Sequence, residues 1–340
     1  MARACAATIA FLTLALAACG HELPLSTGGD RAPAPPPVDA GSPADAGPGP
    51  AGDGGWGPPY PIVLAHGFAG FDQIGPVEYF YQVPELLRGD GHQVYVAQVD
   101  PFDDSYDRGA ELLAYVQAVL AQSGAAKVDI IAHSQGGLDA RYAAHRYPAG
   151  IAAVVTIATP HRGTPLADLA VSGPAGSAAM AALEQISGAV SPDGGVAAGF
   201  VAALNQLTTA GTAQFNQAIP DAPGVAYFSI GGRSNFAGTG GQCAAVEPGF
   251  VSRWDAYVDP TGAEFLFSGP WLSGDPLSPA TNDGLVPAAS AQWGTFLGCV
   301  PADHFEEIGQ LLGQPAGPGN AFAYRDFYRE LADWLVKQGY

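Results

Sequence analysis

The residues Val128-Asp-Ile-Ile-Ala-His-Ser-Gln-Gly-Gly137 decide the fold of this chain. Their apolar first half predicts a buried strand, and a helix is expected from about Leu138 to Tyr147. Ser134 would then occupy a sharp strand-to-helix turn, with its hydroxyl exposed at the C-terminal edge of a sheet. Such a turn needs small neighbours, and Ala132 and the two glycines supply them, with alanine replacing the first glycine of the G-x-S-x-G pattern. Ser134 is the candidate nucleophile; the alternative is a glycine-rich turn that merely exposes a serine.

The composition predicts a folded domain and excludes one class of partner. The chain has 340 residues, enough for one large α/β domain or two smaller ones, and 48% of them are hydrophobic. Only 13% are charged, and the net charge is −19. Nucleic acid is excluded as a partner, because no basic surface is available to neutralise phosphates. The acidic balance favours solubility and by itself indicates no specific partner.

The first residues have the pattern of an export signal. Arg3 precedes an apolar run, Ala6–Ala18, that is too short to cross a membrane, so we predict a signal peptide at residues 1–18. Leu16-Ala-Ala-Cys19 resembles a bacterial lipoprotein cleavage site, at which the Cys19 thiol would carry a diacylglycerol and the new N-terminus an acyl chain. Two or three chains anchor a protein stably. We expect an exported lipoprotein at the outer membrane or cell surface; the alternative is ordinary cleavage and secretion.

Residues 19–59 are predicted to form a flexible tether. They consist mainly of proline, glycine, alanine, serine and aspartate, with almost no large apolar side chain. Such a segment cannot bury enough surface to fold. The folded domain is therefore expected at residues 60–340.

Strand and helix patterns alternate in the first part of this domain. Continuous apolar runs bounded by turn residues are typical of strands that are covered on both faces. We expect strands at 61–65, 94–99, before Ser134 and at 152–158, with helices at 76–88 and 106–122. This alternation predicts an α/β fold with a mostly parallel central sheet flanked by helices.

Residues 164–223 interrupt the alternation. They contain helical patterns rich in alanine, glycine and leucine and no strand pattern. A long helical insertion of this kind is typical of a lid over a binding site. The alternative is an ordinary covering of one face of the sheet. A strand at 225–230 and an amphipathic helix at about 322–337 complete the expected domain.

A serine hydroxyl becomes a nucleophile only with a base within hydrogen-bond reach and an acid that orients the base. In folds of this type the order along the chain is nucleophile, acid, base, with the last two on loops after late strands. Among the seven histidines, His304 is the only one that follows a candidate acid. It is the predicted base; the alternative is a surface histidine beside two glutamates.

Asp283 is the predicted acid. It lies in Asn282-Asp-Gly284, a turn that could present a carboxylate at the end of a strand, although most Asp-Gly pairs are plain turns. Asp255, Asp259 and Asp303 are competitors, and Asp303 is expected to point elsewhere because it adjoins His304.

The same chemistry needs two backbone N–H groups directed at the developing oxyanion. One is expected from the residue after the nucleophile, Gln135. The other is expected from Phe68, in the His66-Gly-Phe68 turn that follows the first predicted strand. The alternative is that this second segment is only a turn.

Cysteine positions allow a single internal disulfide. Of the four cysteines, Cys5 and Cys19 lie in or next to the predicted signal, which leaves Cys243 and Cys299. Export favours a disulfide between them, and two buried free thiols are the alternative.

With these residues identified, the chain resembles the bacterial lipases of the Pseudomonas and Burkholderia type, which have the α/β-hydrolase fold. The resemblance runs from about Tyr60 to Trp334. It is carried by an ordered series of motifs: Tyr60-Pro-Ile-Val-Leu-Ala-His-Gly-Phe68, Gly70-Phe-Asp72, Gln93-Val-Tyr-Val96, Ala132-His-Ser-Gln-Gly-Gly137, Arg141-Tyr142, Thr159-Pro-His-Arg-Gly163, Leu204-Asn-Gln-Leu-Thr208, Phe215-Asn216, Asn282-Asp-Gly-Leu-Val286 and His304-Phe-Glu-Glu-Ile-Gly-Gln310.

The resemblance implies a triacylglycerol lipase with a helical lid that opens at an oil–water interface. It also implies a structural calcium ion near the base, held by Asp259, by the residue at position 306 and by the Gln310 carbonyl. The family has aspartate where this chain has Glu306, which puts the ion in question. The family's disulfide corresponds by position to Cys243 and Cys299.

Further expectations follow from the same resemblance. Many relatives need a membrane-bound foldase to mature, although nothing in this chain indicates that need. Relatives are mostly released, so the predicted lipid anchor is a departure. We expect a monomer that acts on a lipid ester at an interface and uses no organic cofactor.

The expected activity is carboxylic-ester hydrolysis through an acyl-enzyme on Ser134, His304 and Asp283. The closest alternative is an esterase or polyester depolymerase with the same triad. A more distant alternative is a surface binding protein that kept the fold without catalysis.

Overall fold

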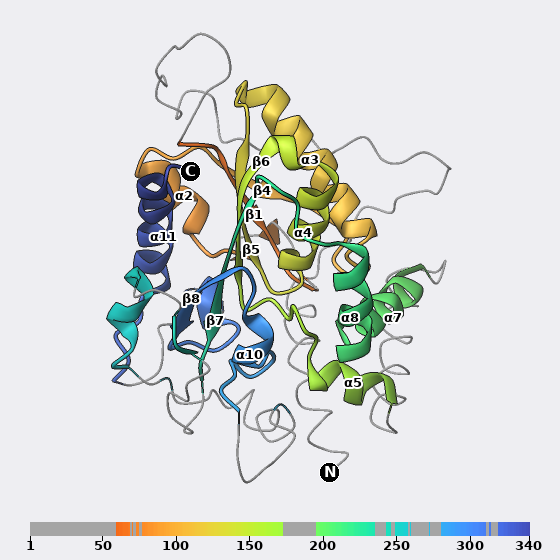
Figure 1. The fold of residues 1–340 in the computed structure, drawn as a ribbon. Helices are drawn as coiled ribbons and strands as arrows, with labels where there is room; N and C mark the ends of the chain where they lie inside the picture. The colour runs from red at the N-terminus through yellow and green to blue at the C-terminus, as the bar shows by residue number, and fades with distance from the viewer. Residues whose placement is uncertain are drawn as a thin grey trace.

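A six-stranded parallel sheet forms the centre of the computed structural model (Figure 1), and its strand order is β4-β1-β5-β6-β7-β8. The structure describes residues 59–68, 70, 73–74, 77–172, 195–234, 243–245, 249–257, 259, 272, 280–310, 313 and 319–340. The strands of the sheet are β1 (Ile62–Ala65), β4 (Val94–Ala97), β5 (Val128–His133), β6 (Ile151–Ile157), β7 (Ala226–Gly232) and β8 (Thr295–Val300). A separate antiparallel pair is formed by β2 (Gln73–Ile74) and β3 (Val77–Glu78).

Side chains of β1 alternate between two apolar layers, one on each face of the sheet. Ile62 and Leu64 belong to a core shared with helices α2 (Val83–Gly89) and α11 (Tyr324–Gln338). Val63 and Ala65 belong to a core shared with α3 (Asp107–Ser123) and α4 (Gly136–Arg146). The two helix pairs lie on opposite sides of the sheet in Figure 1. Burial on both faces explains why these strands are continuous apolar runs, as the sequence predicted.

In the part of the predicted insertion that the structure describes, three helices follow β6. They are α5 (Pro165–Ser172), α7 (Gly195–Leu207) and α8 (Thr209–Ala218), which lie beside α4 at the lower right of Figure 1. A small core joins them to α4 through Leu138, Ala167, Leu207, Phe215 and Ile219. The side chain of Thr208 caps α8 by accepting a hydrogen bond from the Gly211 amide. Residues 173–194 of the predicted lid lie outside the described residues.

Two elements differ from the prediction. Helix α2 begins at Val83 rather than at residue 76, because Val77–Glu78 pairs with Gln73–Ile74 in a hairpin and Pro84 occupies the first helical turn. Strand β8 was not predicted; its apolar run is short and contains Gly298, which has φ 116°. The other predicted strands and the closing helix are present, and the α/β fold with a parallel sheet is confirmed.

The N-terminal predictions cannot be placed on the structure. The signal at residues 1–18, Cys19 and the tether up to residue 58 lie outside the described residues. Within the described part of the chain, no helix has the length and apolar character needed to cross a membrane.

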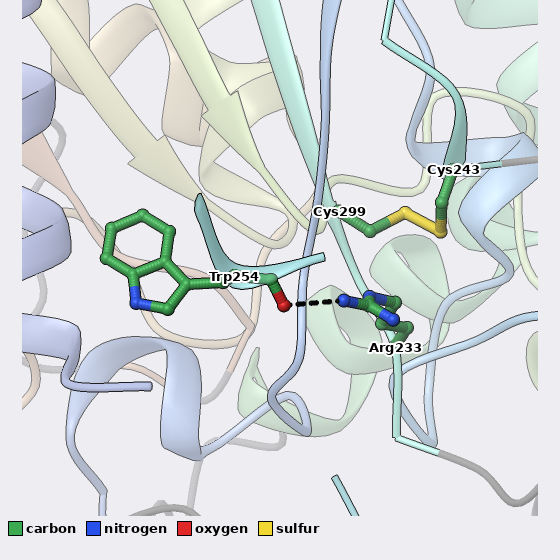
Figure 2. The surroundings of a disulfide bond; sticks show 4 residues. All are labelled: Arg233, Cys243, Trp254 and Cys299. Atoms are coloured by element: carbon green, nitrogen blue, oxygen red, sulfur yellow. Dashed lines mark hydrogen bonds between the residues drawn. A yellow bond between two sulfur atoms is a disulfide. The ribbon is translucent and has the colours of Figure 1, made fainter. Parts of the chain in front are cut away.

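A disulfide fastens the segment after β7 to strand β8. Cys243 and Cys299 are bonded, with their Cα atoms 5.2 Å apart. Beside it, Arg233 donates a hydrogen bond of 2.9 Å to the Trp254 carbonyl, at the end of the 3₁₀ helix Phe250–Trp254 (Figure 2). The alternative of two free thiols is therefore wrong.

Candidate active site

Ser134 follows the C-terminal end of β5 in a strained backbone conformation. Its φ is 56°, in the left-handed region that few residues other than glycine adopt, and its amide donates to the Ile157 carbonyl of β6 at 2.9 Å. The neighbouring backbone is very close: a Cβ at Gly136 would lie 2.5 Å from the His66 carbonyl oxygen, and one at Gly67 would lie 2.6 Å from the Ser134 Cβ. Small residues on both sides are thus a steric requirement of this turn.

His304 and Asp283 meet Ser134 at this edge of the sheet. The Nε2 atom of His304 lies 3.0 Å from the Ser134 Oγ, and its Nδ1 atom lies 2.8 Å from Oδ2 of Asp283. Oδ1 of the buried Asp283 accepts hydrogen bonds from the amides of Leu285 and Val286, at 2.8 and 2.6 Å. With a proton on Nδ1 facing the carboxylate, Nε2 is free to accept the serine proton.

A second buried network lies behind His304. The centre of the His133 ring lies 4.5 Å from that of the His304 ring. The Nδ1 atom of His133 is hydrogen-bonded to Tyr79 Oη at 2.7 Å, and its Nε2 atom is hydrogen-bonded to Glu307 Oε2 at 3.0 Å. Burial lowers the pKa of His133 well below its ordinary value, and burial together with nearby carboxylates raises the pKa of Glu307 well above its ordinary value. Both shifts favour the neutral form of each group. The sequence analysis identified neither Tyr79 nor Glu307 as part of the site.

The two expected oxyanion donors follow the ends of neighbouring strands. Phe68 follows β1, whose end adjoins the end of β5, and Gln135 is the residue immediately before α4. Neither amide donates a hydrogen bond to any of the described residues, so each can still donate one to a ligand.

Arg108 of α3 ties together the segments that surround the site, and sequence reasoning missed it. Its guanidinium donates to Oδ2 of Asp139 on α4 at 2.8 Å, to the His66 carbonyl at 2.8 Å and to the Asp100 carbonyl at 2.6 Å. Both charged side chains are fully buried. The only sequence feature at Arg108 is the charge pattern Arg-Gly-x-Glu at the start of α3. That pattern does not indicate which residues the guanidinium contacts.

Three carboxylates converge beside the loop that carries His304. One oxygen each from Asp259, Asp303 and Glu306 lies within 4.8 Å of the others. Burial, followed by the charges of Asp303 and Asp259, raises the pKa of Glu306 to about 9. Asp303 had been considered only as a competing acid, whereas the structure places it with the two predicted calcium ligands. The side-chain nitrogen of Gln310 donates to the Tyr79 carbonyl at 2.9 Å.

Comparison with known proteins agrees with this geometry. The family model described as the alpha/beta hydrolase fold matches residues 60–194. A triacylglycerol lipase from Pseudarthrobacter phenanthrenivorans is 35% identical over 288 residues, which cover 75% of this chain and 90% of that protein. Another from Burkholderia plantarii is 35% identical over 288 residues, covering 75% of this chain and 80% of that protein. The mature Bacillus licheniformis lipase BlEst2 has a similar structure, with a TM-score of 0.53, 25% identity and coverage of 74% of this chain and 88% of that one.

Proposed function

Since the chain belongs to the triacylglycerol lipase family and is a serine ester hydrolase, we propose that Ser134, His304 and Asp283 are its catalytic triad. The observation that carries this proposal is the unbroken hydrogen-bonded series from the Ser134 hydroxyl through the imidazole to the Asp283 carboxylate. The substrate is a lipid ester, and we infer that acylglycerols are preferred to small polar esters.

The proposed reaction has two halves. Oγ of Ser134 attacks the carbonyl carbon of the ester while Nε2 of His304 takes the hydroxyl proton, and Asp283 stabilises the imidazolium that forms. The amides of Phe68 and Gln135 bind the oxyanion, and loss of one such donor typically costs ~10²–10³ in rate. His304 then protonates the departing alcohol. Water, activated by the same imidazole, releases the fatty acid from the acyl-enzyme.

A fluorophosphonate probe tests the assignment of the nucleophile. At neutral pH it should label the wild-type protein once, on Ser134, and should label neither Ser134→Ala nor, at a comparable rate, His304→Ala. Hydrolysis of p-nitrophenyl esters of increasing chain length, with and without an emulsion, tests the substrate class. No labelling would favour a binding protein, and a preference for acetate with no increase at the interface would favour an esterase or polyester depolymerase.

We further propose that Asp259, Asp303 and Glu306 hold a structural calcium ion. Hard oxygen ligands are what calcium prefers. Burial and the charges of Asp303 and Asp259 disfavour the ionised form of Glu306 in this cluster, and a bound cation would favour that form. The ion would fix the loop that carries His304 and would take no part in bond making. The Gln310 carbonyl remains a predicted further ligand.

Calorimetric titration and thermal unfolding test this site without reference to activity. Calcium should bind with one-to-one stoichiometry and raise the melting temperature, and EDTA should reverse the shift. Glu306→Gln, which keeps the size but removes a charge, should weaken binding, whereas a melting temperature unaffected by calcium would contradict the proposal. Asp326→Asn, an exposed change on α11, provides the control.

Anchoring through Cys19 is also proposed, on the evidence of the Leu16-Ala-Ala-Cys19 sequence. It would place the protein at the outer membrane or cell surface. Cells fed with labelled palmitate should incorporate it into the wild-type protein and not into Cys19→Ala. No label in either protein would favour secretion, and equal label in both would show that the lipid is attached at a position other than Cys19. The requirement for a foldase stays a prediction, which expression with and without a lipase-specific foldase would test.

A further inference from the structure

The two proposed oxyanion donors share a neighbour through their side chains. The ring of Phe68 lies 5.9 Å from that of Phe102 in an edge-to-face arrangement. The side-chain amide of Gln135 donates a hydrogen bond of 2.9 Å to the carbonyl of Asp103. The segment Phe102–Ser105, which lies between β4 and α3, therefore contacts both residues that we propose as oxyanion donors.

Helix α7 holds this same segment from the other side. Oε1 of Gln206 accepts a hydrogen bond of 2.7 Å from the Ser105 amide, and both residues are buried. The ring of Phe200 lies 5.1 Å from that of Phe68 and 6.3 Å from that of Phe102. At Gly199 the helix backbone is so close to the segment that a Cβ would lie 3.3 Å from the Phe102 carbonyl oxygen.

These contacts form a continuous connection from the insertion to the oxyanion donors. On the basis of the proposed function, we infer that Gln206 and Phe200 of α7 are positioning residues for the oxyanion hole. Gln206 fixes the segment Phe102–Ser105, to which Gln135 is bonded, and Phe200 fixes the side chain of Phe68. When α7 is in this place both amides are oriented, and when it moves away both lose their support.

Among the described hydrogen bonds and ring contacts, neither positioning residue is joined to the reacting groups. The described hydrogen bonds of Gln206 go to Ser105 and not to Ser134 or His304, and the ring contacts of Phe200 are with Phe68 and Phe102. Their effect must therefore pass through the amides. Because transition-state stabilisation by such donors depends on sub-ångström placement, loosening them lowers kcat more than it raises KM.

The test compares Gln206→Leu with Gln206→Glu on p-nitrophenyl acetate, a soluble substrate too short to sense a change in an acyl pocket. Gln206→Leu removes the acceptor and should lower kcat ~10-fold, less than full loss of one donor, with KM changed less than about twofold. Gln206→Glu keeps an acceptor for the Ser105 amide and should restore most of the rate. Val201→Ala, at a 37% exposed position next to Phe200 on the same helix, should behave as the wild type.

Binding of phenylboronic acid separates positioning from general damage. Its tetrahedral adduct with a serine places an oxygen in the oxyanion hole, so its inhibition constant should rise in Gln206→Leu by the same factor as kcat falls. Phe200→Ala should also lower kcat and raise the inhibition constant by similar factors. This variant provides the test if Gln206→Leu does not fold. Wild-type kcat and boronic acid affinity in either folded variant would overturn the inference. Failure of fluorophosphonate to label wild-type Ser134 would instead overturn the proposed function.

Discussion

Gly136 shows how the strained turn at Ser134 depends on a missing side chain. A Cβ at this position would meet the carbonyl oxygens of His66 and Ala65 at 2.5 and 2.6 Å, and these belong to the backbone of β1 and its loop. Because backbone cannot rotate aside as a side chain can, Gly136→Ala should lower the free energy of unfolding by about 1–3 kcal/mol. Activity should fall further, since the displaced loop carries Phe68. Urea unfolding and esterase assays would measure both.

Ala132→Gly is the matched control for this prediction. It restores the usual G-x-S-x-G pattern and removes a methyl group within β5, so it should cost about 0.5–1 kcal/mol and leave the rate nearly unchanged. If Gly136→Ala were as mild as this control, the steric explanation of the turn would be wrong.

Arg108 carries a second prediction at this scale. Removing it leaves the buried Asp139 carboxylate without its cation, which typically costs about 3–5 kcal/mol. Arg108→Met should therefore destabilise the protein strongly in urea unfolding. The double variant Arg108→Met with Asp139→Leu should recover much of that stability, because the uncompensated charge is gone. A double variant no more stable than the single one would show that the hydrogen bonds to the loop carbonyls matter more than the charge.

Chemistry and chain order were enough to predict from the sequence that Ser134, His304 and Asp283 lie together. A serine nucleophile needs a histidine base, and that base needs an acid before it in the chain. Few of the seven histidines meet this requirement. Residues such as Tyr79, Arg108 and Asp303 could not be selected in this way. Their roles depend on which groups they meet across the fold, and no local pattern specifies those partners.

Among the elements, β5 contains a titratable group at the opposite end from Ser134. Asp129 is 2% exposed, and burial raises its pKa to about 8 from an ordinary 3.8. Between these pH values the native state retains a proton that the unfolded state has lost, so this residue makes stability fall as pH rises from about 4 to about 8. The effect is complete above the folded pKa.

Asp129→Asn should remove this dependence. Its melting temperature relative to the wild type should increase by several degrees between pH 5 and pH 8, as scanning calorimetry would measure. Gln217→Ala, an exposed change on α8 that removes no titratable group, should give a difference that stays constant with pH. A constant difference for Asp129→Asn as well would mean that the carboxyl ionises normally in its strand.

At the same scale, the elements that were predicted correctly are those whose pattern is long and continuous. Every residue of β6 is buried, and α11 buries one continuous face. The apolar pattern of each sequence therefore predicts its secondary structure. The start of α2 and the whole of β8 were missed, because a two-residue hairpin and a glycine within a short strand leave little periodic pattern.

The whole molecule brings together residues that are 170 positions apart, Ser134 and His304. That proximity was predictable because parallel strands place their C-terminal ends at one edge. The packing of α7 against the segment Phe102–Ser105 was not, since it depends on the path of an insertion whose contacts follow no general rule.

The Cys243–Cys299 disulfide acts at this largest scale. It closes a loop of 56 residues, and the loop includes Asp283 and β8 as far as Cys299. In the chain-entropy view, such a cross-link stabilises the native state by about 4 kcal/mol by restricting the unfolded chain. Replacing both cysteines by serine should therefore lower the urea midpoint and increase the slope of the transition, because the unfolded chain is no longer restricted, while leaving the kcat on soluble esters nearly unchanged. The wild type measured in reductant should match the double variant. A fall in kcat under fully native conditions would instead show that the disulfide is needed to hold the loop of His304 in place.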